Sequence, residues 1–115
     1  EVPEEVVDEN VEFVVVEEMP VFRNGNADLM RYLSENIKYP TVSAEQGVQG
    51  RVVVQFVVGV HGEILNPLVV KMVDPYLDKE AIRVISSMPK WKPGKQRGKA
   101  VRVKYTVPVV FRLQS

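Results

Sequence analysis

Residues 101–115 read VRVKYTVPVVFRLQS, and their alternation of apolar and polar side chains predicts a β-strand with one buried face. The positions expected to face the core are Val101, Val103, Tyr105, Val107, Val109, Phe111 and Leu113. Pro108 lies in the middle of this strand, although proline has no N–H group to donate to a neighbouring strand. The sequence therefore predicts that the C-terminal strand lies at an edge of its sheet.

The composition is that of one small domain. The chain has 115 residues, of which 45% are hydrophobic, which is enough for a single core. It has no cysteine, which excludes disulfides, thiol nucleophiles and cysteine-ligated metals. No apolar run approaches the roughly 20 residues that cross a bilayer. The first residues, EVPEEVVDEN, resemble the middle of a longer protein, so we interpret the chain as a fragment.

The net charge of zero hides an uneven distribution of charge. Residues 1–18 contain eight acidic residues and no basic one, whereas residues 90–104 contain seven basic residues and no acidic one. We interpret residues 1–18 as an acidic linker that can include one short strand, and residues 19–115 as the folded domain. The asymmetry fits a solvated linker, self-association or a charged partner.

Two helices are predicted from spacing and punctuation. In NGNADLMRYLSENIKYP, Asn24 or Asn26 is expected to cap the helix and Pro40 to end it. The following residues, 41–50, are expected to form a short helical turn or a loop. The second helix is expected to begin with Asp74 as its N-cap and Pro75 at its first position.

Residues 51–73 predict a β-hairpin that turns at GVHG, with a bulge near Asn66–Pro67. Because Pro67 and Pro108 mark two of the three long strands, the strand 51–58 is expected to be central. The predicted fold is α+β: a two-layer sandwich of two helices on a three-stranded antiparallel sheet, in the order 2-1-3, with the C-terminal strand at the edge.

No catalytic or metal-binding pattern is recognisable. His61 is the single histidine, in the predicted hairpin turn, and no carboxylates have a spacing that suggests acid–base work. We predict no enzyme, cofactor or metal. Trp91 could stack a nucleobase or pack at the edge of the core. Tyr105 faces away from Lys104, which argues against a nucleic-acid surface.

The C-terminal edge itself supports two readings. A free row of N–H and C=O groups can accept an extended peptide by strand addition. Arg102, Lys104 and Arg112 are also the kind of charges that protect an edge from unwanted pairing. From the residues alone both readings stay open.

Three ordered stretches resemble the C-terminal domain of the TonB energy-transducer family, in versions from Bacteroides-type bacteria. After the Tyr39–Pro40 pair, they are QGVQGRVVVQFVVGVHGEI, LDKEAIRVISSMPKWKPG and VRVKYTVPVVFRL. The resemblance as a whole covers about residues 20–113.

The resemblance implies a periplasmic domain whose parent protein is anchored in the inner membrane. Such a domain binds the TonB box, a short extended segment of an outer-membrane receptor, by adding it to its last strand. Motor proteins of the inner membrane supply proton-motive force through an N-terminal region, and the pull admits nutrients. The residues that the resemblance assigns to partner binding are Arg97, Val101, Arg102, Val103, Lys104, Tyr105, Thr106 and Val107.

A second reading belongs to another class. The same type of domain resembles the C-terminal interaction module of membrane sensor metallopeptidases and of other envelope proteins. Self-association into a homodimer through the same edge is open under either reading.

Overall fold

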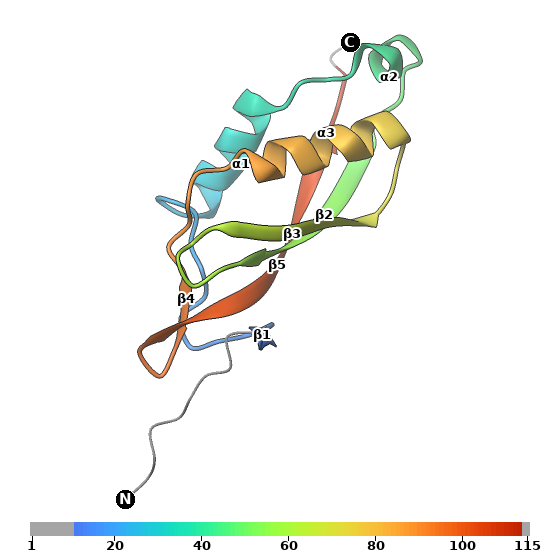
Figure 1. Cartoon of the computed structure of the whole chain (residues 1–115). Helices are drawn as coiled ribbons and strands as arrows, with labels where there is room; N and C mark the ends of the chain where they lie inside the picture. Colours follow the sequence, from blue (N-terminus) through green and yellow to red (C-terminus); the bar gives the residue numbers. More distant parts are fainter. Residues whose placement is uncertain (1–10, 114–115) are drawn as a thin grey trace, which may run out of the picture.

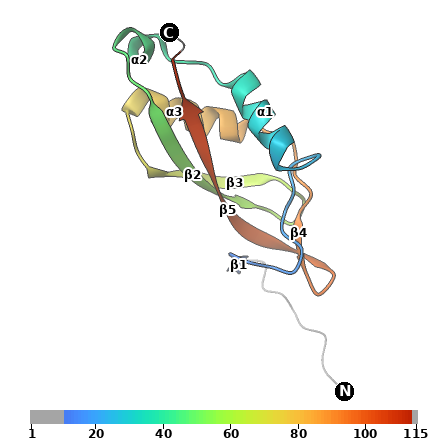
Figure 2. The same cartoon turned by 180° about the vertical axis from the view of Figure 1, so that it is seen from behind.

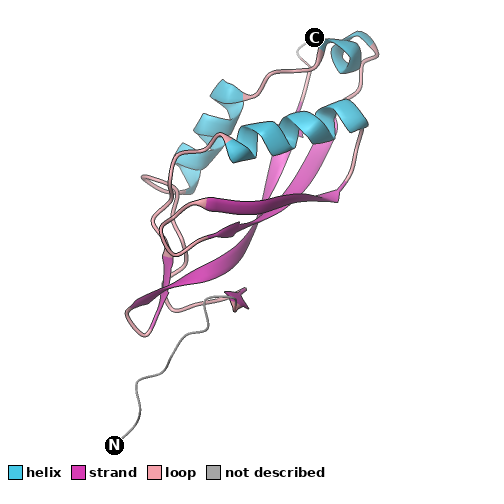
Figure 3. Ribbon diagram, viewed as in Figure 1, coloured by secondary structure: helices cyan, strands magenta, loops and turns pink. Residues whose placement is uncertain are grey.

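The computed structural model describes residues 11–113, in which helices cover one face of a curled, mostly antiparallel sheet (Figures 1 and 3). The elements are β1 (Glu12–Phe13), α1 (Asn26–Asn36), α2 (Thr41–Glu45), β2 (Gly50–Val58), β3 (Ile64–Lys71), α3 (Pro75–Ser86), β4 (Gly94–Gln96) and β5 (Lys99–Phe111).

Helix α1 begins one residue away from the predicted caps. Gly25 is the N-cap, and no side chain caps the helix, so the prediction of Asn24 or Asn26 was wrong. The backbone explains this, because Gly25 has φ +118°, a conformation that glycine adopts readily. Asp28 in the first turn instead accepts two 2.8 Å hydrogen bonds from Arg23, which lower the pKa of its carboxyl.

Helix α3 forms as the sequence predicts. The Asp74 carboxylate accepts hydrogen bonds from the backbone N–H groups of Tyr76 and Leu77, both at 3.1 Å, and Pro75 occupies the first turn. The buried face of α3 consists of Leu77, Ala81, Val84 and Ile85, and Met88 is buried just after the helix.

A third helix, α2, adds to the two that were predicted. It has five residues and follows Pro40, which serves as its N-cap. Ser43 of α2 donates a 2.9 Å hydrogen bond to the cap carboxylate Asp74, so α2 is tied to the start of α3.

The sheet has five strands within the described residues, not three. Four of them follow the order β1-β5-β2-β3, and β4 pairs with β5. The three long strands have the predicted order, with β2 between β5 and β3. The predicted bulge is present, since the register shifts between the pairs Gln55–Leu68 and Val57–Leu65, and Asn66 has φ +50°.

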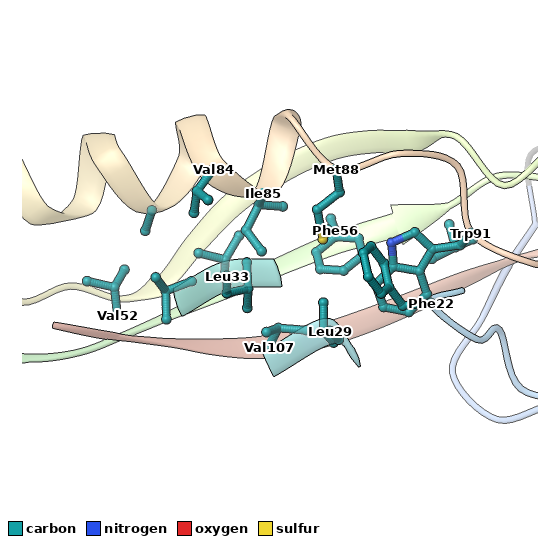
Figure 4. Packing of buried hydrophobic residues seen from close by; sticks show 14 of the residues in the cluster. Phe22, Leu29, Leu33, Val52, Phe56, Val84, Ile85, Met88, Trp91 and Val107 are labelled. Atoms are coloured by element: carbon teal, nitrogen blue, oxygen red, sulfur yellow. The ribbon is translucent and has the colours of Figure 1, made fainter. Parts of the chain in front are cut away.

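The main core lies between the helices and the sheet (Figure 4). Trp91 is 3% exposed and packs here against the rings of Phe22, Phe56 and Tyr105, at 5.0–5.6 Å between centroids. Of the two roles considered for Trp91, packing in the core is therefore the one observed. A second, smaller cluster of Val16, Val101 and Val103 lies at the other end of β5. The long strand β5 thus contributes to two separate apolar clusters.

Candidate functional site

The side chains of β5 alternate as the sequence predicts. Five of the odd-numbered residues are buried, namely Val101, Val103, Val107, Val109 and Phe111. Tyr105 is half-buried, and the even-numbered residues are exposed or half-exposed. The side chains of the buried valines therefore stabilise the domain, and only the backbone of β5 and its even-numbered side chains can meet a partner.

The position of Pro108 fixes which backbone groups point outward. Pro108 lies opposite Val53 in an unbroken ladder that runs from Gly50–Phe111 to Val58–Val103. In an antiparallel ladder, hydrogen-bonded and non-hydrogen-bonded pairs alternate, and a residue without N–H fits only the second kind. The N–H and C=O groups of Lys104, Thr106 and Val110 share this phase and point away from β2. Proline is tolerated here because its missing N–H faces outward.

On the inner side of β5, the chain fills the whole length of the strand. Val58, the last residue of β2, lies opposite Val103, and Gly94 of β4 lies opposite Val101. Strand β4 therefore continues the line of β2 on the same side of β5 (Figure 1). Arg97 and Gly98, with φ of +52° and +74°, form the two-residue turn between β4 and β5.

The outer side of β5 is partly covered, which corrects the prediction that the C-terminal strand is an edge throughout. Strand β1 pairs with it in parallel, with Glu12 opposite Arg102 and Phe13 opposite Val103. Viewed from behind, β1 lies on the opposite side of β5 from β2 and β3 (Figure 2). The sequence analysis allowed a short strand in residues 1–18, but two residues carry no signal of which strand they pair with.

Beyond Val103, the outer side of β5 is open as far as the structure describes the chain. No described strand pairs with the outer side of residues 104–111. This stretch presents the carbonyls of Lys104 and Pro108 and both backbone groups of Thr106 and Val110, whereas the Lys104 N–H faces Phe13 of β1. We call residues 104–111, on this side, the docking edge.

Charged groups surround the boundary between the covered and the open parts. The Lys104 ammonium lies 3.7 Å from the Glu12 carboxylate, and both side chains are partly exposed. Arg102 is half-exposed on the same face as Lys104. Arg97 lies apart from both, in the hairpin turn, where its backbone N–H donates to the Glu17 carboxylate at 2.5 Å.

The structure thus sorts the residues assigned to partner binding. Lys104 and Thr106 lie on the docking edge with exposed side chains, and Tyr105 contacts Trp91 beside them. Val107 lies in the same stretch, but its side chain is buried and its N–H and C=O groups face β2. Arg102 and Val103 lie under β1, and Val101 lies between β4 and the smaller cluster. The assignment itself stays a prediction.

Sequence reasoning missed the β4–β5 hairpin and placed the open stretch too early. The signal for the hairpin was present, because Arg97–Gly98 separates two short runs and Gly suits a two-residue turn. His61 is exposed in the Gly59–Gly62 turn, as predicted. Among the described residues there is no cluster of three side chains that could ligate a metal.

The sequence model for the C-terminal domain of the Gram-negative bacterial TonB protein matches residues 35–113. The chain belongs to the TonB C-terminal domain family. The resemblance seen in the sequence is thereby confirmed, and the family is a periplasmic, transport-associated one without catalytic function.

Solved structures support the TonB-type fold. A solution structure of the Helicobacter pylori TonB C-terminal domain matches with a TM-score of 0.60 and 22% identity, over 77% of this chain and 94% of that one. A structure of a longer fragment of the same domain gives 0.53 and 19%, over 76% and 81%. No curated protein sequence matches.

The described part of this TonB-type chain includes no helix long and apolar enough to span a membrane.

Proposed function

We propose that this domain binds the TonB box of outer-membrane receptors by strand addition at the docking edge. Through that contact it couples the proton-motive force of the inner membrane to nutrient uptake. The observation that carries the proposal is the open outer side of residues 104–111, on a long strand in a domain of the TonB family. The inner-membrane motor proteins would act through a region N-terminal to this domain.

The docking edge offers a guest strand an incomplete ladder. Thr106 and Val110 each present an N–H and a C=O, whereas Pro108 presents a carbonyl alone. A guest can therefore pair along the stretch but loses one donor in its middle. Strand addition over so short a length covers little area, and we expect affinities of about 1 μM, or roughly −8 kcal/mol.

Helix α1 provides an apolar flank for the guest. Tyr32 marks the side of α1 that faces α3, since its hydroxyl donates to the Ser87 carbonyl at 2.9 Å. At 3.6 residues per turn, Met30 lies on the side turned away from α3, and it is 38% exposed. Half-buried Ile37 follows α1 as its C-cap and packs against the main core. We expect apolar guest side chains on the helix side of the sheet.

A titration with a synthetic N-terminal peptide of a TonB-dependent receptor tests the proposal. The amide NMR signals of Thr106 and Val110 should shift most. Thr106→Pro should abolish these shifts, because it removes an outward N–H and leaves the ladder with β2 intact. Thr106→Val keeps the N–H and is the matched control that should bind.

Thermal unfolding of both variants shows whether the fold is kept. Shifts confined to the Gly59–Gly62 turn, or equal binding by the folded Thr106→Pro variant, would overturn the proposal.

A further inference from the structure

The segment Val11–Glu18, which we call the strap, lies across the part of β5 next to the docking edge. Its strand β1 occupies the outer side of Arg102 and Val103, the continuation of the same edge. The chain thus already carries one extended segment on this side of β5.

The C-terminal half of the strap is firmly held. Val16 is 7% exposed and packs against Val101 and Val103. The Glu17 backbone N–H donates to the Gln96 side chain at 3.0 Å. Glu18 exchanges two backbone hydrogen bonds with Lys95, at 3.0 and 2.8 Å.

The N-terminal half of the strap is held more loosely. Glu12 and Phe13 are both half-buried, and β1 has two residues. The ion pair of Glu12 with Lys104 is long, at 3.7 Å, and its side chains are 29% and 43% exposed. Between the halves, Val14 and Val15 are 66% and 78% exposed. Residues 12–13 can therefore leave β5 while residues 16–18 stay attached.

We propose that β1 is an intramolecular occupant of β5 that an incoming strand displaces, and that this strand carries a carboxylate which replaces Glu12 at Lys104. The inference rests on the strand addition proposed above. Displacement extends the available edge from 104–111 back to Arg102. It also indicates the chemistry of the partner. A guest without a carboxylate would break the Glu12–Lys104 ion pair and leave the Lys104 ammonium without a negatively charged partner at this position.

Competition by β1 has a measurable consequence. When a site is free for only a fraction of the time, its apparent dissociation constant equals the intrinsic constant divided by that fraction. If β1 is docked for about nine-tenths of the time, releasing it should tighten binding about tenfold.

The probe is a labelled peptide with the strap's own sequence, VDENVEFVVVEE, which corresponds to residues 7–18. Fluorescence anisotropy compares the unaltered protein with Phe13→Pro, in which proline removes a ladder N–H and the ring that packs at the smaller cluster. The matched control is Val15→Ala, at an exposed position. We expect about tenfold tighter binding to Phe13→Pro and unchanged binding to Val15→Ala. Equal affinity for all three proteins, or no binding to any, overturns the inference.

A second pair of variants does not depend on proline. Glu12→Lys places two positive charges together and should release β1, with about threefold tighter binding. Glu18→Lys makes the same change of net charge at an exposed side chain whose anchoring is through its backbone, and should have no such effect. Equal effects from both variants would show that net charge acts, and would overturn the inference.

The carboxylate is tested on the peptide. Replacing the glutamate that corresponds to Glu12 by glutamine should weaken binding to Phe13→Pro about threefold, and Lys104→Gln in the protein should remove that difference. If the glutamate and glutamine peptides bind equally well, the proposed role of the carboxylate is rejected. The receptor-peptide titration separates this inference from the proposed function. If the receptor peptide shifts the signals of residues 104–110 but the strap peptide binds all variants equally, only the displacement of β1 is rejected. If the receptor peptide causes no shifts along 104–110, the proposed function is rejected.

Discussion

The two halves of β5 share one alternating sequence pattern but have different surroundings. Residues 99–103 have β4 and the end of β2 on the inner side, and β1 lies against Arg102 and Val103 on the outer side. Residues 104–111 have β2 on the inner side and no described strand on the outer side. The comparison teaches that alternation reports which face of a strand is buried, whereas its free edge depends on distant segments of the chain.

The apolar packing under the two halves also differs. The second half lies over the main core, with Phe56, Trp91 and the helices, while the first half meets the small cluster around Val16. The buried face of the open half therefore has the more extensive apolar packing of the two. The docking edge thus lies on a closely packed apolar base.

The largest expected loss of stability comes from a substitution in the main core under the open half of β5. Phe56 is fully buried, and its ring meets those of Trp91 and Tyr105 at 5.5 and 6.0 Å. Phe56→Ala should lower the free energy of unfolding by about 3–5 kcal/mol, through lost burial and a cavity. Urea unfolding measures this. A loss of unfolding free energy below about 1 kcal/mol would mean that packing in the main core does not stabilise the open half of β5.

A smaller effect concerns the segment Lys38–Tyr39, which packs beside Phe111 at the end of the open half of β5. Glu80 accepts a 2.6 Å hydrogen bond from the Lys38 backbone N–H and bonds from Arg83 at 2.7 Å. The neighbouring Tyr39 ring packs edge-on against Phe111 at 5.6 Å. Glu80→Gln should cost about 1–3 kcal/mol at neutral pH, while the exposed Glu45→Gln should cost little.

The same pair predicts a pH dependence. Burial raises the pKa of Glu80, but the hydrogen bonds from Arg83 and Lys38 outweigh it, so the pKa lies below the ordinary value of 4.5. A lowered pKa means that the stabilisation is complete above the ordinary value and is lost as the pH falls through the lowered one. The stability difference between the native protein and Glu80→Gln should therefore shrink in acid. A difference that is independent of pH would contradict the account.

The smallest effect isolates the covered half. Val16→Ala removes two methyl groups from the small cluster and should cost about 1–2 kcal/mol. The exposed Val15→Ala is the control and should be close to neutral. Amide exchange should rise at Val101 and Val103 but not at Val107 or Val109. Equal acceleration along the whole of β5 would show that the halves do not differ in their support.

Much of the fold was predictable because its signals are local. Asp74 and Pro75 start a helix by chemistry within a few residues, and the proline positions placed strand 51–58 in the centre of the sheet. The cap of α1 was not predictable in this way, since Gly25 replaces a side-chain cap by backbone conformation. The strand β4 was missed because three residues do not show a period.

The candidate site was predictable in its strand but not in its extent. The family resemblance assigned Lys104 and Thr106 to partner binding, alternation placed their side chains away from the core, and both residues lie on the docking edge. The cover over Arg102 and Val103 comes from residues about 90 positions away in the sequence, and no local pattern encodes such a contact. Its pairing with β5 depends on the packing of Val16, which only the folded chain brings into place.

The free outer edge of β5 is tested most directly by amide hydrogen exchange, residue by residue, in the unliganded protein. The account predicts an alternation, with fast exchange at Thr106 and Val110 and slow exchange at Tyr105, Val107 and Val109. Protection of Thr106 and Val110 equal to that of Val107 would mean that another segment already covers the edge, and would contradict the account.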